Sequence, residues 1–113
     1  MKRKKSLSKP DPANILLVDE SYSIHKKKGN GIIRRQVWAN AKGEIMRYSL
    51  AYINNKLFHG DNGRVLGYDN AHGYHHKHYM GSIEPVNFKN FEDIERQFEQ
   101  EFEVIHEKAK ERQ

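Results

Sequence analysis

The clearest structural signal in the sequence is Arg47-Tyr48-Ser49-Leu50-Ala51-Tyr52-Ile53, in which large and small side chains alternate. Successive residues of a β-strand point to opposite faces of a sheet, so this alternation predicts a half-buried strand. One face carries Tyr48, Leu50 and Tyr52, and the other carries Arg47, Ser49 and Ala51.

Further strands are expected on both sides of this one, because turn residues punctuate the chain. Residues 32–38 and 64–69 are predicted strands, and the turn signals Gly29-Asn30-Gly31 and Asn40-Ala41-Lys42-Gly43 flank residues 32–38. Residues 15–18 form an apolar run that is too short to distinguish a strand from a helical turn. Short connections between consecutive strands favour an antiparallel meander.

A helix is expected after the strands, because apolar residues recur there at spacings of three and four. These residues are Phe91, Ile94, Phe98, Phe102, Ile105 and Ala109. Asn90 can cap the helix, with Asp93 at the third helical position as in a capping box. We therefore predict an α+β fold: an antiparallel meander sheet of about four strands with a C-terminal amphipathic helix packed on one face. Phe98 and Phe102 should be buried between the helix and the sheet.

The composition fits one small domain, since 36% of the 113 residues are hydrophobic and 31% are charged. Residues 1–12 are basic, contain Ser and Pro and have little to bury, so we expect a disordered basic arm. Residues 13–113 are expected to form a single α+β domain.

Several classes of protein are excluded by what the sequence lacks. There is no cysteine, which excludes disulfides, thiolate metal sites and a cysteine nucleophile. No apolar run approaches the ~20 residues that span a bilayer, and the basic N-terminus lacks the apolar stretch of a signal peptide. We expect a cytoplasmic protein without a membrane partner.

Charge is distributed unevenly along the chain. Residues 1–90 carry 16 Lys/Arg and 7 Asp/Glu, whereas residues 91–113 carry 4 Lys/Arg and 8 Asp/Glu. A basic body favours a polyanionic partner such as RNA, because Lys and Arg contacts with phosphate drive nucleic-acid binding.

Histidines are concentrated in one short segment. Four of the seven, His72, His75, His76 and His78, lie directly after the expected strand at 64–69. The whole segment Tyr68–Gly81 is polar, which predicts a surface loop at a strand end, where scaffolds often present functional groups.

Three kinds of chemistry suit this segment. Imidazole titrates near neutral pH, so two histidines can act as base and acid in cleaving RNA, whose 2′-OH supplies an internal nucleophile. Asp69 with two or three histidines can instead form an N/O metal site, although the spacing matches no helical HExxH motif. The histidines can also stack and hydrogen-bond in a loop that holds RNA without cleaving it.

The same segment resembles a known family. The run Leu66-Gly67-Tyr68-Asp69-Asn70-Ala71-His72-Gly73, then His75-His76-Lys77-His78 and Gly81, then Glu84-Pro85-Val86 and Phe88, resembles the TumE family of toxin–antitoxin proteins. The strand at residues 47–52 and the closing helix are also similar to that family, so the resemblance extends over about residues 15–106. It implies a small toxin encoded beside an antitoxin, usually a helix-turn-helix DNA-binding protein.

The residue chemistry predicts a toxin that acts on RNA as a metal-independent ribonuclease without a cofactor. His72 and His78 are expected to act as base and acid, with Asp69 orienting a histidine. The expected substrate-binding residues are Arg47 (or nearby Arg64) and Lys77 at phosphate, Tyr68 or Tyr79 stacked on a base, Asn70 and His76. The expected partners are RNA and the cognate antitoxin. The alternative is a non-catalytic RNA- or protein-binding module that uses the same loop.

Overall fold

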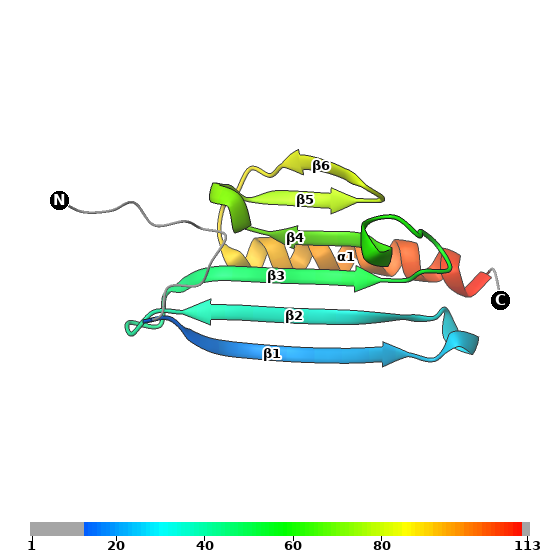
Figure 1. Cartoon of the computed structure of the whole chain (residues 1–113), viewed down its shortest axis with the longest axis horizontal. Helices are drawn as coiled ribbons and strands as arrows, with labels where there is room; N and C mark the ends of the chain where they lie inside the picture. Colours follow the sequence, from blue (N-terminus) through cyan, green and yellow to red (C-terminus); the bar gives the residue numbers. More distant parts are fainter. Residues whose placement is uncertain (1–12, 112–113) are drawn as a thin grey trace.

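The computed structural model describes residues 13–111, so the arm expected at residues 1–12 lies outside the described residues. The chain forms six strands followed by one helix (Figure 1). The elements are β1 (Ile15–Ile24), β2 (Gly31–Ala39), β3 (Ile45–Ile53), β4 (Arg64–Asp69), β5 (His76–Tyr79), β6 (Ser82–Pro85) and α1 (Phe91–Glu111).

The strands form one antiparallel sheet in the order β1-β2-β3-β4-β5-β6, so each strand pairs with its neighbours in the sequence. The predicted α+β meander with a C-terminal helix is therefore confirmed, with six strands in place of about four. The apolar run at residues 15–18 opens the ten-residue strand β1. The remaining additional strands are β5 and β6, which pair as a short hairpin at the far edge.

The segment after β4 differs from the expected surface loop. It contains β5, and two of its histidines are buried: His76 is 2% exposed and His78 is 7% exposed. Polar side chains can be buried when they find hydrogen-bond partners, and here the neighbouring strand supplies them. Composition alone did not reveal this strand, because its buried side chains are histidines and not apolar residues.

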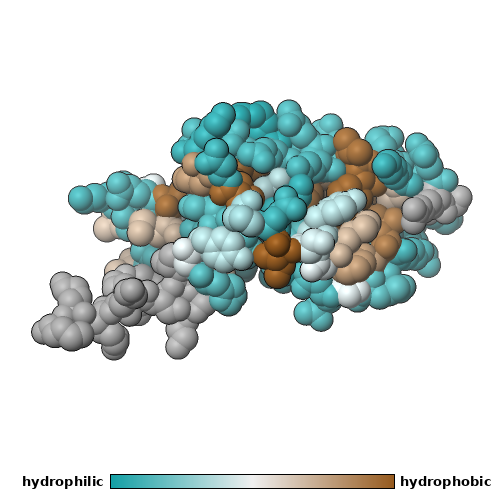
Figure 2. Space-filling view, turned by 90° about the horizontal axis from the view of Figure 1, so that it is seen from above, coloured by the Kyte–Doolittle hydropathy of each residue, from teal (hydrophilic) through white to brown (hydrophobic). Residues whose placement is uncertain are grey.

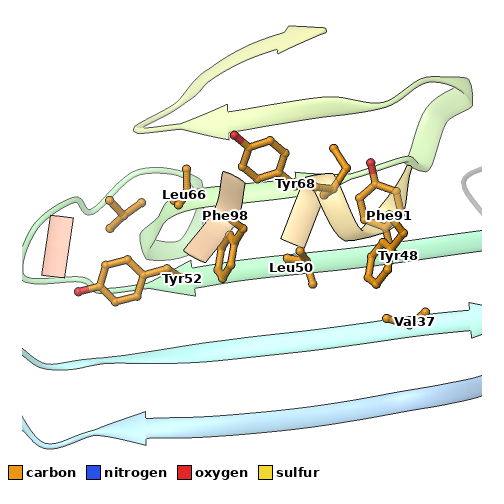
Figure 3. Close-up of a cluster of buried hydrophobic side chains, with 10 residues drawn as sticks. Val37, Tyr48, Leu50, Tyr52, Leu66, Tyr68, Phe91 and Phe98 are labelled. Atoms are coloured by element: carbon orange, nitrogen blue, oxygen red, sulfur yellow. The ribbon is translucent and has the colours of Figure 1, made fainter. Parts of the chain in front are cut away.

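The core lies between the sheet and α1 (Figure 3). β3 contributes Tyr48, Leu50 and Tyr52, as the alternation predicted, and α1 contributes Phe91, Ile94 and Phe98. Asn90 Oδ1 accepts a hydrogen bond from the backbone N–H of Asp93 at 2.8 Å, which confirms the expected cap. Phe98 is buried as predicted, whereas Phe102 is partly exposed.

The helix covers only part of one sheet face. It packs on β3 and β4, and Figure 1 shows it running behind these strands while β1 and β2 extend beyond it. Seen from the β6 edge, the surface is mainly hydrophilic with separate hydrophobic patches (Figure 2). Among the described residues, no helix is long and apolar enough to cross a membrane.

Candidate functional site

The sheet face opposite α1 is lined by polar and small side chains from four strands. Strand pairing aligns them in two rows across the sheet. The first row is Gln36, Ser49, Asp69 and His76, and the second is Arg34, Ala51, Gly67 and His78. We call these eight residues the polar sheet face. Part of it forms an open hollow of about 240 Å³, bordered by Arg34 and Arg64 with Ser49 and Ala51 between them.

Asp69 holds two histidines of this face together. Its Oδ1 lies 3.0 Å from Nε2 of His76, and its Oδ2 lies 3.2 Å from Nε2 of His78. The centres of the two imidazole rings are 4.8 Å apart, and the ring planes are inclined at 66°. These three residues, the His–Asp cluster, come from the end of β4 and from β5, where pairing places Asp69 opposite His76.

Arg64 reaches the cluster from the start of β4. Its guanidinium contacts Asp61 at 2.9 Å through Nε and Nδ1 of His78 at 3.1 Å through Nη2. Its Nη1 lies 3.8 Å from Oδ2 of Asp69. Gly67 permits this path, because a Cβ built at position 67 would lie 2.8 Å from Cδ of Arg64. The sequence therefore needs a glycine here to let the arginine cross the strand.

The hydrogen bonds define the tautomer of His78. An arginine N–H can only donate, so Nδ1 of His78 accepts and its Nε2–H donates to Asp69, which makes His78 a neutral imidazole. His76 faces acceptors on both sides, the carbonyl oxygen of Tyr74 at 3.0 Å from Nδ1 and Asp69 at Nε2.

Burial lowers the pKa of His78 below the ordinary value, and the Arg64 guanidinium lowers it further. The adjacent imidazole of His76 acts in the same direction, while the carboxylates of Asp69 and Asp61 oppose the shift. His78 therefore stays neutral to a lower pH than an exposed histidine, which is the state that a general base requires.

The lowered pKa values predict a loss of stability in mild acid. Burial also lowers the pKa of His75, whose ring stacks on Phe88 at 3.8 Å and bonds to Tyr48. As the pH falls below the ordinary value of 6.5, the unfolded chain takes up protons before the folded chain does. The contribution of neutral His75 and His78 to stability should be complete above pH 6.5. It should be lost as the pH falls through their lowered folded-state pKa values.

Urea unfolding between pH 8 and pH 5 measures this loss. The double variant His75→Gln/His78→Gln should show a shallower decline than the wild type. His72→Gln changes an exposed histidine of the same segment and is the matched control. An identical slope for the double variant and the wild type would contradict the prediction.

The His–Asp cluster also has the composition of a metal site, since its ligand atoms lie within 4.8 Å of one another. Two imidazoles and one carboxylate can hold a zinc-like ion with an open coordination position. The Arg64 guanidinium, however, already lies beside both Asp69 and His78. Arg64 is itself paired with Asp61, and a metal ion would have to replace the hydrogen bonds between Asp69 and both histidines.

The structure separates the residues that the sequence placed in one loop. His72 lies in an exposed 3-10 turn, with its ring 6.4 Å from that of His76. Tyr68, Lys77 and Tyr79 instead face the helix side of the sheet, because they alternate with the cluster along β4 and β5. Lys77 pairs with Glu101 of α1 at 3.0 Å, and the Tyr68 ring is buried against Phe98.

Two further expected residues have structural partners. Asn70 accepts a hydrogen bond from the Tyr48 N–H and donates one to the Met46 carbonyl, which ties the end of β4 to β3. The Arg47 guanidinium lies 5.2 Å from the Trp38 ring centre. Within residues 13–111 its buried Nη1 has no hydrogen-bond partner.

Sequence reasoning missed Arg34, which borders the hollow, and Tyr74, whose exposed ring lies 4.6 Å from His76. The sequence signal for Arg34 was available: an even spacing within its strand puts it on the same face as Gln36. The path of Arg64 across Gly67 had no comparable signal, because it depends on the sheet register.

Taken together, the fold and the site define a small α+β protein with a polar, histidine-bearing sheet face. The family model described as "Toxin TumE" matches residues 17–109, and the chain belongs to this family of toxins from toxin–antitoxin systems. Membership implies a cognate antitoxin. Comparison with curated proteins and with solved structures gave no match.

Proposed function

We propose that this toxin acts on RNA as a metal-independent endoribonuclease, with the polar sheet face as its substrate-binding surface. The observation that carries the proposal is the placement of His78 between Asp69 and Arg64. This combines an oriented neutral imidazole with a cation that attracts phosphate, the two groups that RNA cleavage by the 2′-OH requires.

His78 is the proposed general base. Asp69 accepts a hydrogen bond from its Nε2–H, so Nδ1 of His78 presents a lone pair toward the Arg64 guanidinium. An RNA phosphate would draw the guanidinium toward itself and free this lone pair. Nδ1 then accepts the 2′-OH proton while the 2′ oxygen attacks phosphorus. These hydrogen bonds therefore favour His78 as the base, whereas the sequence analysis expected it to act as the acid.

His72 is the proposed general acid, because its ring is exposed beside the cluster while that of His76 is buried. It donates a proton to the 5′ oxygen as the bond from that oxygen to phosphorus breaks. The products are a 2′,3′-cyclic phosphate end and a 5′-hydroxyl end. His76 and Asp69 act as positioning residues for His78.

The cations and rings near the cluster supply binding. Arg64 and the exposed Arg34 border the hollow and can contact consecutive phosphates. Arg47 lies on the same side of β3 as Ser49 and adds a further cation to this face. Tyr74, exposed and next to His76, can stack on a base.

The experiment is to induce the toxin without its antitoxin, follow growth, and map the ends of cleaved RNA. We expect growth arrest and cleavage that leaves 5′-hydroxyl ends, with the same cleavage by purified toxin in EDTA. Growth arrest with intact RNA would contradict the nuclease proposal. A loss of cleavage in EDTA that one added metal restores would contradict its metal-independent form.

Gly67→Ala tests the path of Arg64 without removing a charge. The new Cβ would lie 2.8 Å from Cδ of Arg64, so the Arg64 side chain would have to leave the hollow in which it is proposed to bind phosphate. Losing a hydrogen bond to a charged group costs about 1.5–3 kcal/mol, so RNA affinity should fall by roughly tenfold or more, as in Arg64→Ala. Filter binding measures the affinity, and Ala41→Gly, at an exposed position outside the polar sheet face, is the control. Unchanged affinity in both Gly67→Ala and Arg64→Ala would contradict the role of Arg64.

The near-complete burial of His76 and His78 favours one alternative, a non-catalytic binding module. In that case the cluster holds β4 and β5 together, and the surrounding arginines bind RNA or protein. Substituting the histidines would then lower affinity, and there would be no RNA cleavage to lose. Single-turnover cleavage assays on the purified toxin distinguish the two functions.

A further inference from the structure

A second surface lies on the other face of the sheet, where α1 stops short of β1 and β2 (Figure 1). A groove of about 350 Å³ runs between the helix and these strands. Its floor is apolar, with Tyr22 and Ile33 from the sheet and Phe98 and Phe102 from the helix. Tyr22 is 53% exposed, so the groove leaves a large ring open to solvent.

The helix side of this groove is acidic. Glu95, Glu99 and Glu103 line it, and their spacing of four residues stacks them along one side of α1. Like charges at this spacing destabilise a helix. Arg35 neutralises Glu95 and also binds Glu20 of β1. Among residues 13–111, Glu99 and Glu103 form no ion pair, so two adjacent carboxylates remain uncompensated beside apolar surface.

We propose that this acidic groove binds a basic amphipathic segment of the cognate antitoxin. Apolar side chains of that segment would cover Tyr22 and Phe102, and its Lys or Arg side chains would pair with Glu99 and Glu103. The charges of the chain support this choice, since its net charge is +5 while residues 91–113 carry an excess of acidic groups. A basic partner therefore meets attraction here and repulsion over most of the remaining surface.

Charge also argues against other occupants. RNA would be repelled by the glutamates of the groove. A second copy of this chain related by a two-fold axis would bring the same acidic rows toward each other, because such an interface is self-complementary. The proposal follows from family membership and from this surface, and it is independent of whether the toxin cleaves RNA.

The test uses the full-length toxin and the purified cognate antitoxin. The charge-reversal variant is Glu99→Lys/Glu103→Lys. Its control is Glu84→Lys/Glu111→Lys, which makes the same change in net charge at exposed positions outside the groove. We expect the groove variant to weaken antitoxin binding by at least about tenfold, because like charges would then face each other. The control should change it by less than about twofold.

A second measurement separates a docking role from damage to the fold. A lysine at position 99 can pair with Glu95 at the favourable spacing, so thermal unfolding of the free variant should occur at the same or a higher temperature. Toxicity of the variant expressed alone should persist, whereas rescue by the antitoxin should fail. Equal affinity for the groove variant and the wild type would overturn the proposal, as would equal weakening by the control.

One other result would assign the groove to a different occupant. A wild-type dimer in sedimentation experiments that the groove variant dissociates, with antitoxin affinity unchanged, would assign it to a second copy and overturn the antitoxin proposal.

Discussion

Replacing His78 with alanine should reduce the rate of RNA cleavage by at least about 100-fold, because proton transfer typically contributes 10²–10⁴-fold to a rate. The variant should retain most of its RNA affinity, since Arg34, Arg47 and Arg64 supply the proposed phosphate contacts. His72→Ala should have an effect of similar size if it supplies the proton for the leaving oxygen. Single-turnover rates with saturating enzyme measure chemistry apart from binding.

His59→Ala is the control for both substitutions, because it removes another exposed imidazole outside the histidine segment. It should leave the rate unchanged. The pH dependence gives an independent readout: a base and an acid require opposite protonation states, so the profile should be bell-shaped. Its rising limb should lie on the acidic side of 6.5, because burial lowers the pKa of His78, and it should disappear in His78→Ala. Toxicity that survives both substitutions at normal protein level would eliminate this mechanism.

Phe98→Ala should lower the free energy of unfolding by about 3–5 kcal/mol, the usual range for truncating a buried aromatic ring. Phe98 is 4% exposed, meets Tyr68 edge-on at 6.5 Å between ring centres and stacks on Phe102. Its removal leaves a cavity between α1 and the sheet. A small domain has a total stability of about 5–15 kcal/mol, so this single change removes a large fraction of it.

Urea unfolding followed by circular dichroism measures the effect. Val104→Ala is the matched control, because Val104 lies on the same helix and is 59% exposed. It should change stability by less than about 0.5 kcal/mol. Equal effects of the two substitutions would show that α1 does not pack on the sheet as described.

The main features of the fold could be predicted from local patterns. The alternation around Leu50 gives the central strand and its buried face, and the spacing from Phe91 to Ala109 gives the helix. β5 and β6 could not be predicted in this way. Both strands have only four residues, and the polar side chains of β5 are buried through contact with Asp69. Hydrophobic patterning does not detect a strand whose burial is compensated by hydrogen bonds.

The candidate site could be predicted in composition but not in geometry. The sequence identified Asp69 and the histidine segment, and the structure brings Asp69 together with His76 and His78. The sequence could not show that alternation along β5 sends Lys77 to the opposite face, because the segment was expected to be a loop. Assigning a strand to His76–Tyr79 would have placed His76 and His78 on one face of the sheet and Lys77 on the other.

The meander order also has a consequence for how the toxin is made. Every strand pairs with its sequence neighbour, so each hairpin can form as soon as its second strand leaves the ribosome. The aromatic core, in contrast, closes only when α1 arrives, and α1 follows all six strands in the chain. A nascent chain that still lacks the helix exposes Tyr48, Tyr52 and Tyr68 and has no support behind its histidine-bearing face. The toxin should therefore stay harmless throughout its own synthesis and become active only after translation has passed the helix.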